Sequence, residues 1–155
     1  MMKPLDDYLP YLLNRAGARI AASFTEVVRG YGITLPMWRV LAALGEAGGQ
    51  RMGELARRTS MDASTLTRVI DGMEQRGIAR RVREDGDARS VAVHATPEGG
   101  ALTAKIIPLA LTYEDVALAG FDAAEARLLK QMLVRVFENM DKLDDARAGL
   151  QRDAG

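Results

Sequence analysis

The sequence predicts a mainly α-helical fold, with a two-stranded hairpin near the middle of the chain and long helices at both ends. Two observations lead to this class. Apolar residues recur at spacings of three and four over most of the 155 residues, a spacing typical of amphipathic helices. Between residues 78 and 95 the period changes to two, which is typical of strands. Apolar residues make up 48% of the chain, enough to supply a core.

The first helix is expected over residues 9–31. Its apolar residues fall on one face, at Leu9, Leu13, Ala16, Ile20, Phe24, Val27 and Tyr31. Gly30 and Gly32 should end it.

A second helix should begin at Thr34, whose hydroxyl can cap it, with Pro36 tolerated in the first turn. Its buried side is expected at Trp38, Leu41, Ala42 and Leu44. Glycines at positions 45, 48 and 49 should end this helix.

Residues 52–60 predict a short helix, followed by a tight turn and a longer helix over 62–77. One face of the longer helix is apolar, at Leu66, Val69, Ile70 and Met73. The opposite face carries Ser64, Arg68, Asp71 and Gln75. This second face is free to contact a partner, and Gly77 is suited to end the helix in a left-handed conformation.

Residues 78–83 and 91–95 predict a two-stranded hairpin with a long charged tip. Strict alternation would put Val91, Val93 and Ala95 on one face and His94 on the solvent side.

After the hairpin, Thr96 and Pro97 mark the start of another helix. Its apolar positions are Leu102, Ile106, Leu109, Tyr113 and Val116. Asp122 and Glu125 form a capping box for the last helix. The apolar positions of that helix step by four and three, as in a coiled coil, at Leu129, Leu133, Val136, Met140 and Leu143. We expect these faces to join two copies of the chain; packing within one copy is the alternative.

Composition excludes several kinds of chemistry. The chain has no cysteine and one histidine, which argues against disulfides, thiol chemistry and a conventional zinc site. We therefore expect no metal and no cofactor. An enzyme is not expected either, since carboxylates at the hairpin tip would be solvated and their pKa values would not be raised. No apolar run reaches the roughly 18 residues of a membrane span, and the N-terminus does not resemble a signal peptide, so the expected location is the cytoplasm.

The charge distribution favours DNA only through its position. The formal net charge is zero, but residues 51–93 carry nine arginines and seven acidic residues. The predicted order in this region is helix, turn, helix and hairpin, which is a winged helix-turn-helix. A major groove about 12 Å wide accepts one helix, and the hairpin can place a cation in the neighbouring minor groove. Arg89 would supply that cation, with Asp87 close enough to orient it.

The stretch GIARRVREDGDARSVAVHATPEG, residues 77–99, resembles the wing signature of the MarR family of bacterial transcription regulators. The matching residues are Gly77, Arg81, Asp87, Arg89, Thr96 and Gly99. Residues 35–44 and 61–77 are similar to the same family. Two departures concern the wing: Ala95 replaces a usual leucine, and the tip lacks a proline.

The resemblance implies a homodimer built from the N- and C-terminal helices, a pseudo-palindromic DNA operator, and a small aromatic or amphipathic ligand that lowers DNA affinity. We therefore divide the chain into an N-terminal dimerisation helix, 1–33, a winged helix-turn-helix domain, 34–96, and C-terminal dimerisation helices, 97–155. The expected function is a homodimeric, sequence-specific DNA-binding repressor that a small molecule releases. A helical dimer acting as a protein–protein adaptor is the alternative.

Site roles follow from these positions. We expect contacts to the edges of the DNA bases from Ser64, Thr65, Thr67 and Arg68. For Arg68, the alternative is a surface ion pair with Asp71. Arg89 is assigned to the minor groove, and the alternative is an exposed loop ion pair with Asp87. Phosphate contacts are assigned to Thr59, Ser60, Arg57 and Arg80. A ligand would fit in a crevice between the dimerisation helices and the winged domain, near Tyr31, Trp38, Arg39 and a kink expected at Pro108.

Overall fold

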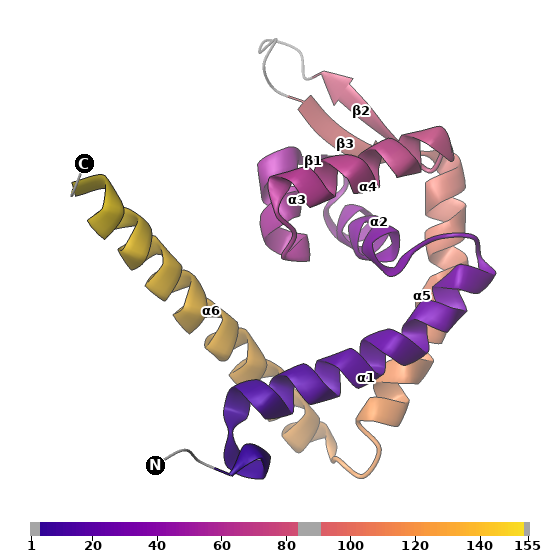
Figure 1. The fold of residues 1–155 in the computed structure, drawn as a ribbon. Coiled ribbons are helices and arrows are strands. Elements are labelled where there is room, and N and C mark those ends of the chain that lie inside the picture. The colour runs from indigo at the N-terminus through magenta and orange to yellow at the C-terminus, as the bar shows by residue number, and fades with distance from the viewer. Residues whose placement is uncertain (1–3, 84–90, 154–155) are drawn as a thin grey trace. The chain divides into compact units, whose positions relative to one another are not determined.

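The computed structural model describes residues 4–83 and 91–153, and it divides into two compact units, Met1–Glu114 and Asp115–Gly155. Figure 1 shows the elements along the chain. The helices are η1 (Leu5–Asp7), α1 (Leu9–Gly30), α2 (Leu35–Ala47), α3 (Met52–Thr59), α4 (Ala63–Gln75), α5 (Pro97–Ala117) and α6 (Ala123–Asp153). The strands are β1 (Gln50–Arg51), β2 (Ala79–Arg83) and β3 (Val91–Ala95). The predicted mainly α-helical fold with a central hairpin is confirmed.

The sheet has three strands where the sequence predicts two. Its order is β1-β3-β2, and all pairs are antiparallel. The hairpin of β2 and β3 is the predicted one, and β1 adds two residues to the free edge of β3, with Gln50 opposite Val93. A two-residue strand shows no alternation of its own, which is why the pattern missed it.

The expected strict alternation along β3 is also wrong. Ala92 and Val93 are neighbours in the chain, yet both are buried, at 1% and 0% exposure. His94 is half-buried rather than turned to solvent. Its ring lies against Gly49, where an added Cβ would come within 2.0 Å of the ring carbon Cε1. Gly49 therefore leaves room for the histidine.

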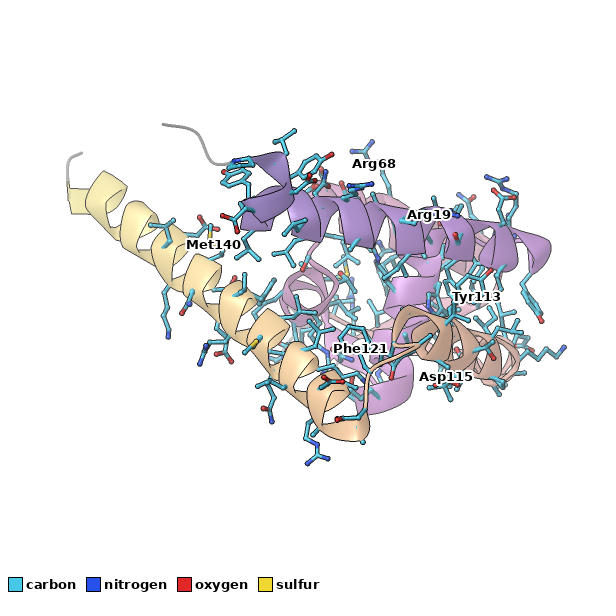
Figure 2. All side chains as sticks on the ribbon, turned by 90° about the horizontal axis from the view of Figure 1, so that it is seen from below. Arg19, Arg68, Tyr113, Asp115, Phe121 and Met140 are labelled. Carbon is cyan, nitrogen blue, oxygen red and sulfur yellow. The ribbon has the colours of Figure 1, made fainter. Side chains whose placement is uncertain are left out.

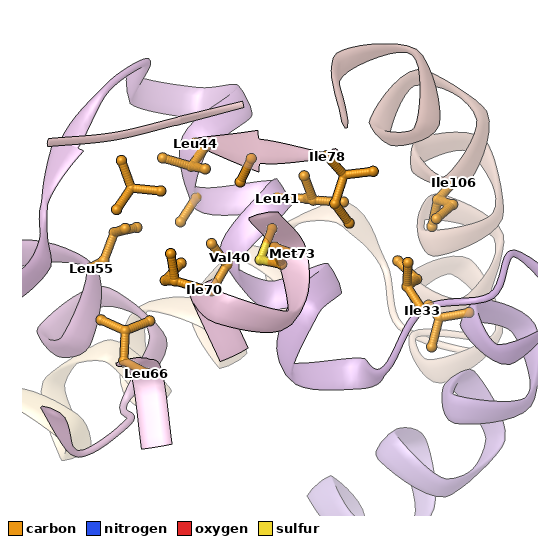
Figure 3. Close-up of a cluster of buried hydrophobic side chains, with 14 of the residues drawn as sticks. Ile33, Val40, Leu41, Leu44, Leu55, Leu66, Ile70, Met73, Ile78 and Ile106 are labelled. Carbon is orange, nitrogen blue, oxygen red and sulfur yellow. The ribbon is translucent and has the colours of Figure 1, made fainter. Parts of the chain in front are cut away.

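The core lies within the first unit, between α2, α3, α4 and the sheet, and it continues to Val28 of α1 and Ile106 of α5 (Figure 3). From α4 it receives Leu66, Ile70 and Met73, as predicted, all at 0% exposure. On α2 the predicted buried side is partly wrong, because Ala42 is exposed and Trp38 is half-buried. Other residues of α2 are buried, namely Val40, Leu41, Ala43 and Leu44. This helix contacts α1, α3, α4 and β3. More of its surface is therefore buried than the single apolar face that the sequence predicts, and the centre of the buried surface lies elsewhere on the helix.

Three predicted helix boundaries are confirmed by their capping bonds. The Thr34 hydroxyl accepts from the backbone N–H of Met37 at 3.4 Å. Gly77 has φ +68° and ends α4 in a Schellman motif, with Ile78 N–H donating to the Met73 carbonyl at 3.0 Å. In the second unit, Asp122 and Glu125 cap each other's backbone N–H groups, both at 2.9 Å.

Thr96 and Gly99 join α5 to the end of α4. The Thr96 hydroxyl donates to the Gly77 carbonyl at 2.6 Å and accepts from the Gly99 N–H at 3.1 Å. A Cβ at Gly99 would lie 2.0 Å from the Ile78 carbonyl oxygen. Glycine is therefore required for the backbone of α5 to approach the chain that leads into β2.

The outer helices leave much apolar surface uncovered. Of the residues of α1, Phe24 and Val28 are buried, and the Phe24 ring contacts Trp38 and Tyr113 at centroid distances of 5.9 and 5.3 Å. Large exposed apolar side chains of α1 and α6, drawn as sticks in Figure 2, include Leu9, Ile20, Leu133, Met140 and Leu143. Among the helices of the described residues, none is both long and apolar enough to cross a bilayer.

Candidate nucleic-acid interface

The turn between α3 and α4 is made by a residue in an unusual conformation. Ser60 has φ +54° and ψ +39°, the left-handed region, and among the described residues it is the non-glycine residue with positive φ. The N–H of Met61 donates to the Ala56 carbonyl at 3.0 Å, which closes the end of α3. An L-residue in this region costs about 1–2 kcal/mol. Ser60 thus carries local strain at the turn between the two helices.

Asp62 organises the start of α4. Its carboxylate accepts three bonds, from the Ser64 hydroxyl at 2.7 Å, the Thr65 hydroxyl at 2.6 Å and the Thr65 N–H at 2.8 Å. The hydroxyl bond from Ser64, followed by those of Thr65, lowers the pKa of Asp62 well below its usual range. Ser64 and Thr65, both assigned to base contacts, are therefore held by the N-cap of the helix that carries them.

Thr67 and Arg68 follow on the exposed surface of α4. The Thr67 hydroxyl donates to the Ala63 carbonyl at 2.9 Å, and Arg68 Nε donates to the Ser64 carbonyl at 3.4 Å. Figure 2 labels Arg68, whose side chain projects away from the ribbon. In this structure Asp71 pairs with Arg81 at 2.8 Å, so the alternative pairing of Arg68 with Asp71 is not the one formed.

Arg81 of β2 binds α4 through several contacts. Its Nη2 lies 2.8 Å from Asp71 Oδ1 and donates to the Thr67 carbonyl at 3.4 Å, while its Nη1 pairs with Glu74. The backbone N–H of Arg81 also donates to Glu74 Oε1 at 2.7 Å. Partial burial opposes the charge of Arg81, but its hydrogen bonds to Asp71 and Glu74 outweigh this and raise its pKa.

The residues assigned to phosphate contacts lie in different surroundings. Ser60 and Arg80 are exposed. Arg57 is exposed too and pairs with Glu54 at 2.7 Å, and that bond lowers the pKa of the Glu54 carboxyl. Thr59 is buried at 6% exposure, and its hydroxyl donates to the Leu55 carbonyl at 2.6 Å. Its hydroxyl is thus engaged inside the domain.

The two residues assigned to the minor groove, Asp87 and Arg89, lie outside the described residues. The strands that carry the tip are described, and Arg83 and Val91 face each other at its base.

A hollow of about 510 Å³ opens between α2 and the end of α3. Trp38, Arg39 and Ala42 line it from α2, and Arg58 and Ser60 line it from the other side. Arg58 is held there by an ion pair with Glu46. Of the three residues assigned to a ligand, the structure brings Trp38 and Arg39 to this hollow. Tyr31 is exposed just after α1 and does not line it.

No group of three or more potential metal-ligating side chains occurs in the part of the chain that the structure describes. The hydroxyl and guanidinium groups of this surface are donors that suit hydrogen bonding to nucleic acid.

Comparison with known proteins assigns the family. The family model described as "MarR family" matches residues 31–90, which include α2, α3, α4 and β2. A solved MarR family transcriptional regulator from Silicibacter pomeroyi is 32% identical, with a TM-score of 0.74, and the match covers 88% of this chain and 99% of that one. The chain belongs to the MarR family.

Two further relatives extend the comparison. The transcriptional activatory protein BadR of Rhodopseudomonas palustris is 31% identical over 129 residues, 81% of this chain and 74% of BadR. Bordetella bronchiseptica BpsR, solved in work on how 6-hydroxynicotinic acid regulates its DNA binding, is 28% identical with a TM-score of 0.72, covering 84% and 98% of the two chains. As a MarR family member, this chain is a DNA-binding transcriptional regulator. The adaptor alternative is not supported.

Three parts of this MarR site were not predicted as such from the sequence. Asp62 could have been recognised as an N-cap from its place before the apolar stripe of α4. The ion pairs of Arg81 with Asp71 and Glu74, called the Arg81 clasp below, join a strand to a helix. No residue spacing within one element predicts such a contact. The ion pair of Arg58 with Glu46 joins positions 12 apart in sequence and depends on how α2 and α3 pack.

Proposed function

We propose that the chain acts as a homodimeric repressor that binds a pseudo-palindromic operator and is released by a small molecule. The observation that carries this proposal is the exposed polar face in the first half of α4. This face belongs to the second helix of a helix-turn-helix unit, with the β2–β3 hairpin beside it. Recognition helices of such units read the major groove with their N-terminal residues.

The proposed base contacts are those of Ser64, Thr65, Thr67 and Arg68. The side-chain bonds of all four are local, to Asp62 or to backbone carbonyls of the same helix, so contact with DNA would exchange one hydrogen bond for another. Arg68 could bond a guanine through two donors, which is worth about 1–3 kcal/mol of discrimination against other bases.

Phosphate contacts are proposed for Ser60, Arg57 and Arg80, which are all exposed. We propose an indirect role for Thr59, because its buried hydroxyl is bonded to Leu55. From the sequence alone, Arg89 is proposed for the minor groove and Asp87 as the group that orients it.

Dimerisation is proposed for the N-terminal helix, residues 1–33, and the C-terminal helices, residues 97–155. The exposed apolar side chains on α1 and α6 support this role, because so much apolar surface favours burial against a second copy. Two recognition helices about 34–36 Å apart would then match successive turns of the major groove.

The proposed ligand site is the hollow beside Trp38 and Arg39. An indole, a guanidinium and a small apolar floor suit a small aromatic or amphipathic molecule. A ligand that favours a different spacing of the recognition helices would lower DNA affinity without touching DNA. Because the partner is chromosomal DNA, we propose that the protein works in the cytoplasm.

In-vitro selection tests the main proposal. The protein is incubated with a random-sequence duplex pool at moderate salt, and the bound duplexes are sequenced. We expect a two-fold symmetric motif with half-sites about one helical turn apart. Folded, dimeric protein that enriches no motif would overturn the proposal.

Single substitutions then test the exposed polar face of α4, called the reading face below. Arg68→Ala should weaken binding to the selected operator by roughly tenfold or more and relax the preference at one base pair. The matched control is Arg29→Ala, which removes an exposed arginine of α1 that pairs with Glu26. Equal operator affinity for the two variants would remove Arg68 from the interface.

A further inference from the structure

The recognition helix carries more negative than positive charge. Within α4, Arg68 is the basic residue, and Asp71 and Glu74 are the acidic ones. Asp71 lies three residues after Arg68 and is 51% exposed. Carboxylates on a helix that approaches phosphates oppose binding, because both carry negative charge and the DNA backbone supplies most of the electrostatic attraction to a protein.

Arg81 meets both carboxylates at once. Its guanidinium pairs with Asp71 through one terminal nitrogen and with Glu74 through the other. Arg81 itself is 28% exposed, so it is more deeply set than Asp71. It stands opposite Val93 in the middle of the hairpin, where the strand pairing fixes its backbone. The cation is therefore held in place by the sheet, not by a flexible loop.

We propose that Arg81 is a positioning residue for DNA binding that acts through charge: its single cation offsets part of the negative charge of Asp71 and Glu74, so that α4 can approach the phosphate backbone. This proposal rests on the proposed function of α4 as the recognition helix. It assigns no DNA contact to Arg81, since its terminal nitrogens are engaged by Asp71, Glu74 and the Thr67 carbonyl.

In the proposed charge mechanism, Arg81 offsets the negative charge of the two carboxylates. The alternative is that its ion pairs only hold β2 against α4, and the two explanations predict different results. Arg81→Met keeps much of the aliphatic stem and removes the cation, which leaves two unpaired carboxylates beside the interface. We expect its affinity for duplex DNA to fall at least tenfold at about 50 mM salt. Adding Asp71→Asn and Glu74→Gln to this variant removes the repulsion, and we expect affinity to return to within about threefold of the wild type.

Operator and random duplex should be measured in parallel. Repulsion from the carboxylates acts on any phosphate backbone, so the charge mechanism lowers both affinities by a similar factor. A displaced hairpin or helix would instead lower operator affinity and leave binding to random duplex unchanged.

A second variant covers the case in which Arg81→Met does not fold, as judged by circular dichroism and thermal melting. Asp71→Asn with Glu74→Gln leaves Arg81 as an unpaired cation beside the interface. The charge mechanism predicts unchanged or higher affinity at low salt, and a clasp needed for geometry predicts lower affinity.

The outcomes separate this proposal from the function on which it rests. Wild-type protein that binds no duplex overturns the regulator proposal itself. Wild-type binding with an unaffected Arg81→Met variant, or with a triple variant as weak as Arg81→Met, overturns the charge role alone. Lower DNA affinity for the Asp71→Asn, Glu74→Gln variant than for the wild type would also overturn the charge role of Arg81.

Discussion

At the scale of single residues, the turn between α3 and α4 combines a strained residue with a strongly bonded one. Ser60 is left-handed, and Asp62, two residues later, accepts three hydrogen bonds. Strain in a turn persists only when the surrounding bonds hold it. Substitution of Ser60 should therefore relieve strain, and substitution of Asp62 should change how stability depends on pH.

Ser60→Gly should raise the free energy of unfolding. Glycine adopts φ +54° without the steric cost, while its greater freedom in the unfolded chain offsets part of the gain, so we expect a net increase of up to about 1 kcal/mol. Urea denaturation measures this change. Operator affinity should fall in the same variant if the Ser60 hydroxyl contacts phosphate. A more stable protein with full affinity would leave Ser60 a role in the turn alone.

Asp62→Asn should make stability less dependent on pH in acid. The pKa of Asp62 is lowered in the folded state, so its contribution is present above its unfolded pKa of about 3.9 and is lost as the pH falls toward the folded value. We expect the melting temperature of the wild type to fall more steeply than that of Asp62→Asn between about pH 5 and pH 2. Parallel curves for the two proteins would contradict this role.

At the scale of elements, the close approach of α5 to the start of β2 depends on one glycine in an adjacent pair. Gly99 faces the Ile78 carbonyl, whereas a Cβ added at Gly100 would meet no other segment of the chain within 4 Å. The two positions lie in the same helical turn and differ in their surroundings.

Gly99→Ala should destabilise the protein by roughly 1–3 kcal/mol, because the new methyl group would force backbone apart. Gly100→Ala is the control and should be neutral or stabilising by up to about 1 kcal/mol, since alanine is the better helix former. Thermal melts of both variants check the pair. Similar melting temperatures would mean that the approach relaxes without cost.

The elements also explain which parts of the fold were predictable. Helices and caps depend on spacings within one segment, so Thr34, Gly77, Asp122 and Glu125 could be assigned their roles from the sequence. Strand β1 and the half-buried His94 depend on which segment lies beside β3, and no local pattern contains that information. The face of α2 was misjudged for the same reason, because several elements pack on it.

At the scale of the whole molecule, the apolar surface of α6 should determine the oligomeric state. Leu133 and Met140 are 42% and 53% exposed and belong to the predicted seam. Leu133→Glu with Met140→Glu should convert a dimer to monomers in sedimentation equilibrium, because buried unpaired charges are costly. The control is Arg135→Glu with Lys142→Glu, which changes two charged positions of α6 outside the seam and should remain dimeric. A dimer that survives the first pair would place the interface elsewhere.

In the candidate site, too, features within one helix could be predicted from the sequence, and features that need several elements could not be predicted in full. The reading face of α4 could be predicted because it is the polar side of one helix. The hollow and the Arg81 clasp arise where separate elements meet, so two of the residues that line the hollow, Trp38 and Arg39, could be predicted from the sequence, but neither its opposite wall nor the partners of Arg81.

The Thr96 hydroxyl has a mechanical consequence. It is bonded at once to the last turn beyond α4 and to the first turn of α5, at 2.6 and 3.1 Å. Gly99 brings the same two segments into backbone contact. These contacts couple the two helices mechanically, so a tilt of α5 would be passed directly to the end of α4.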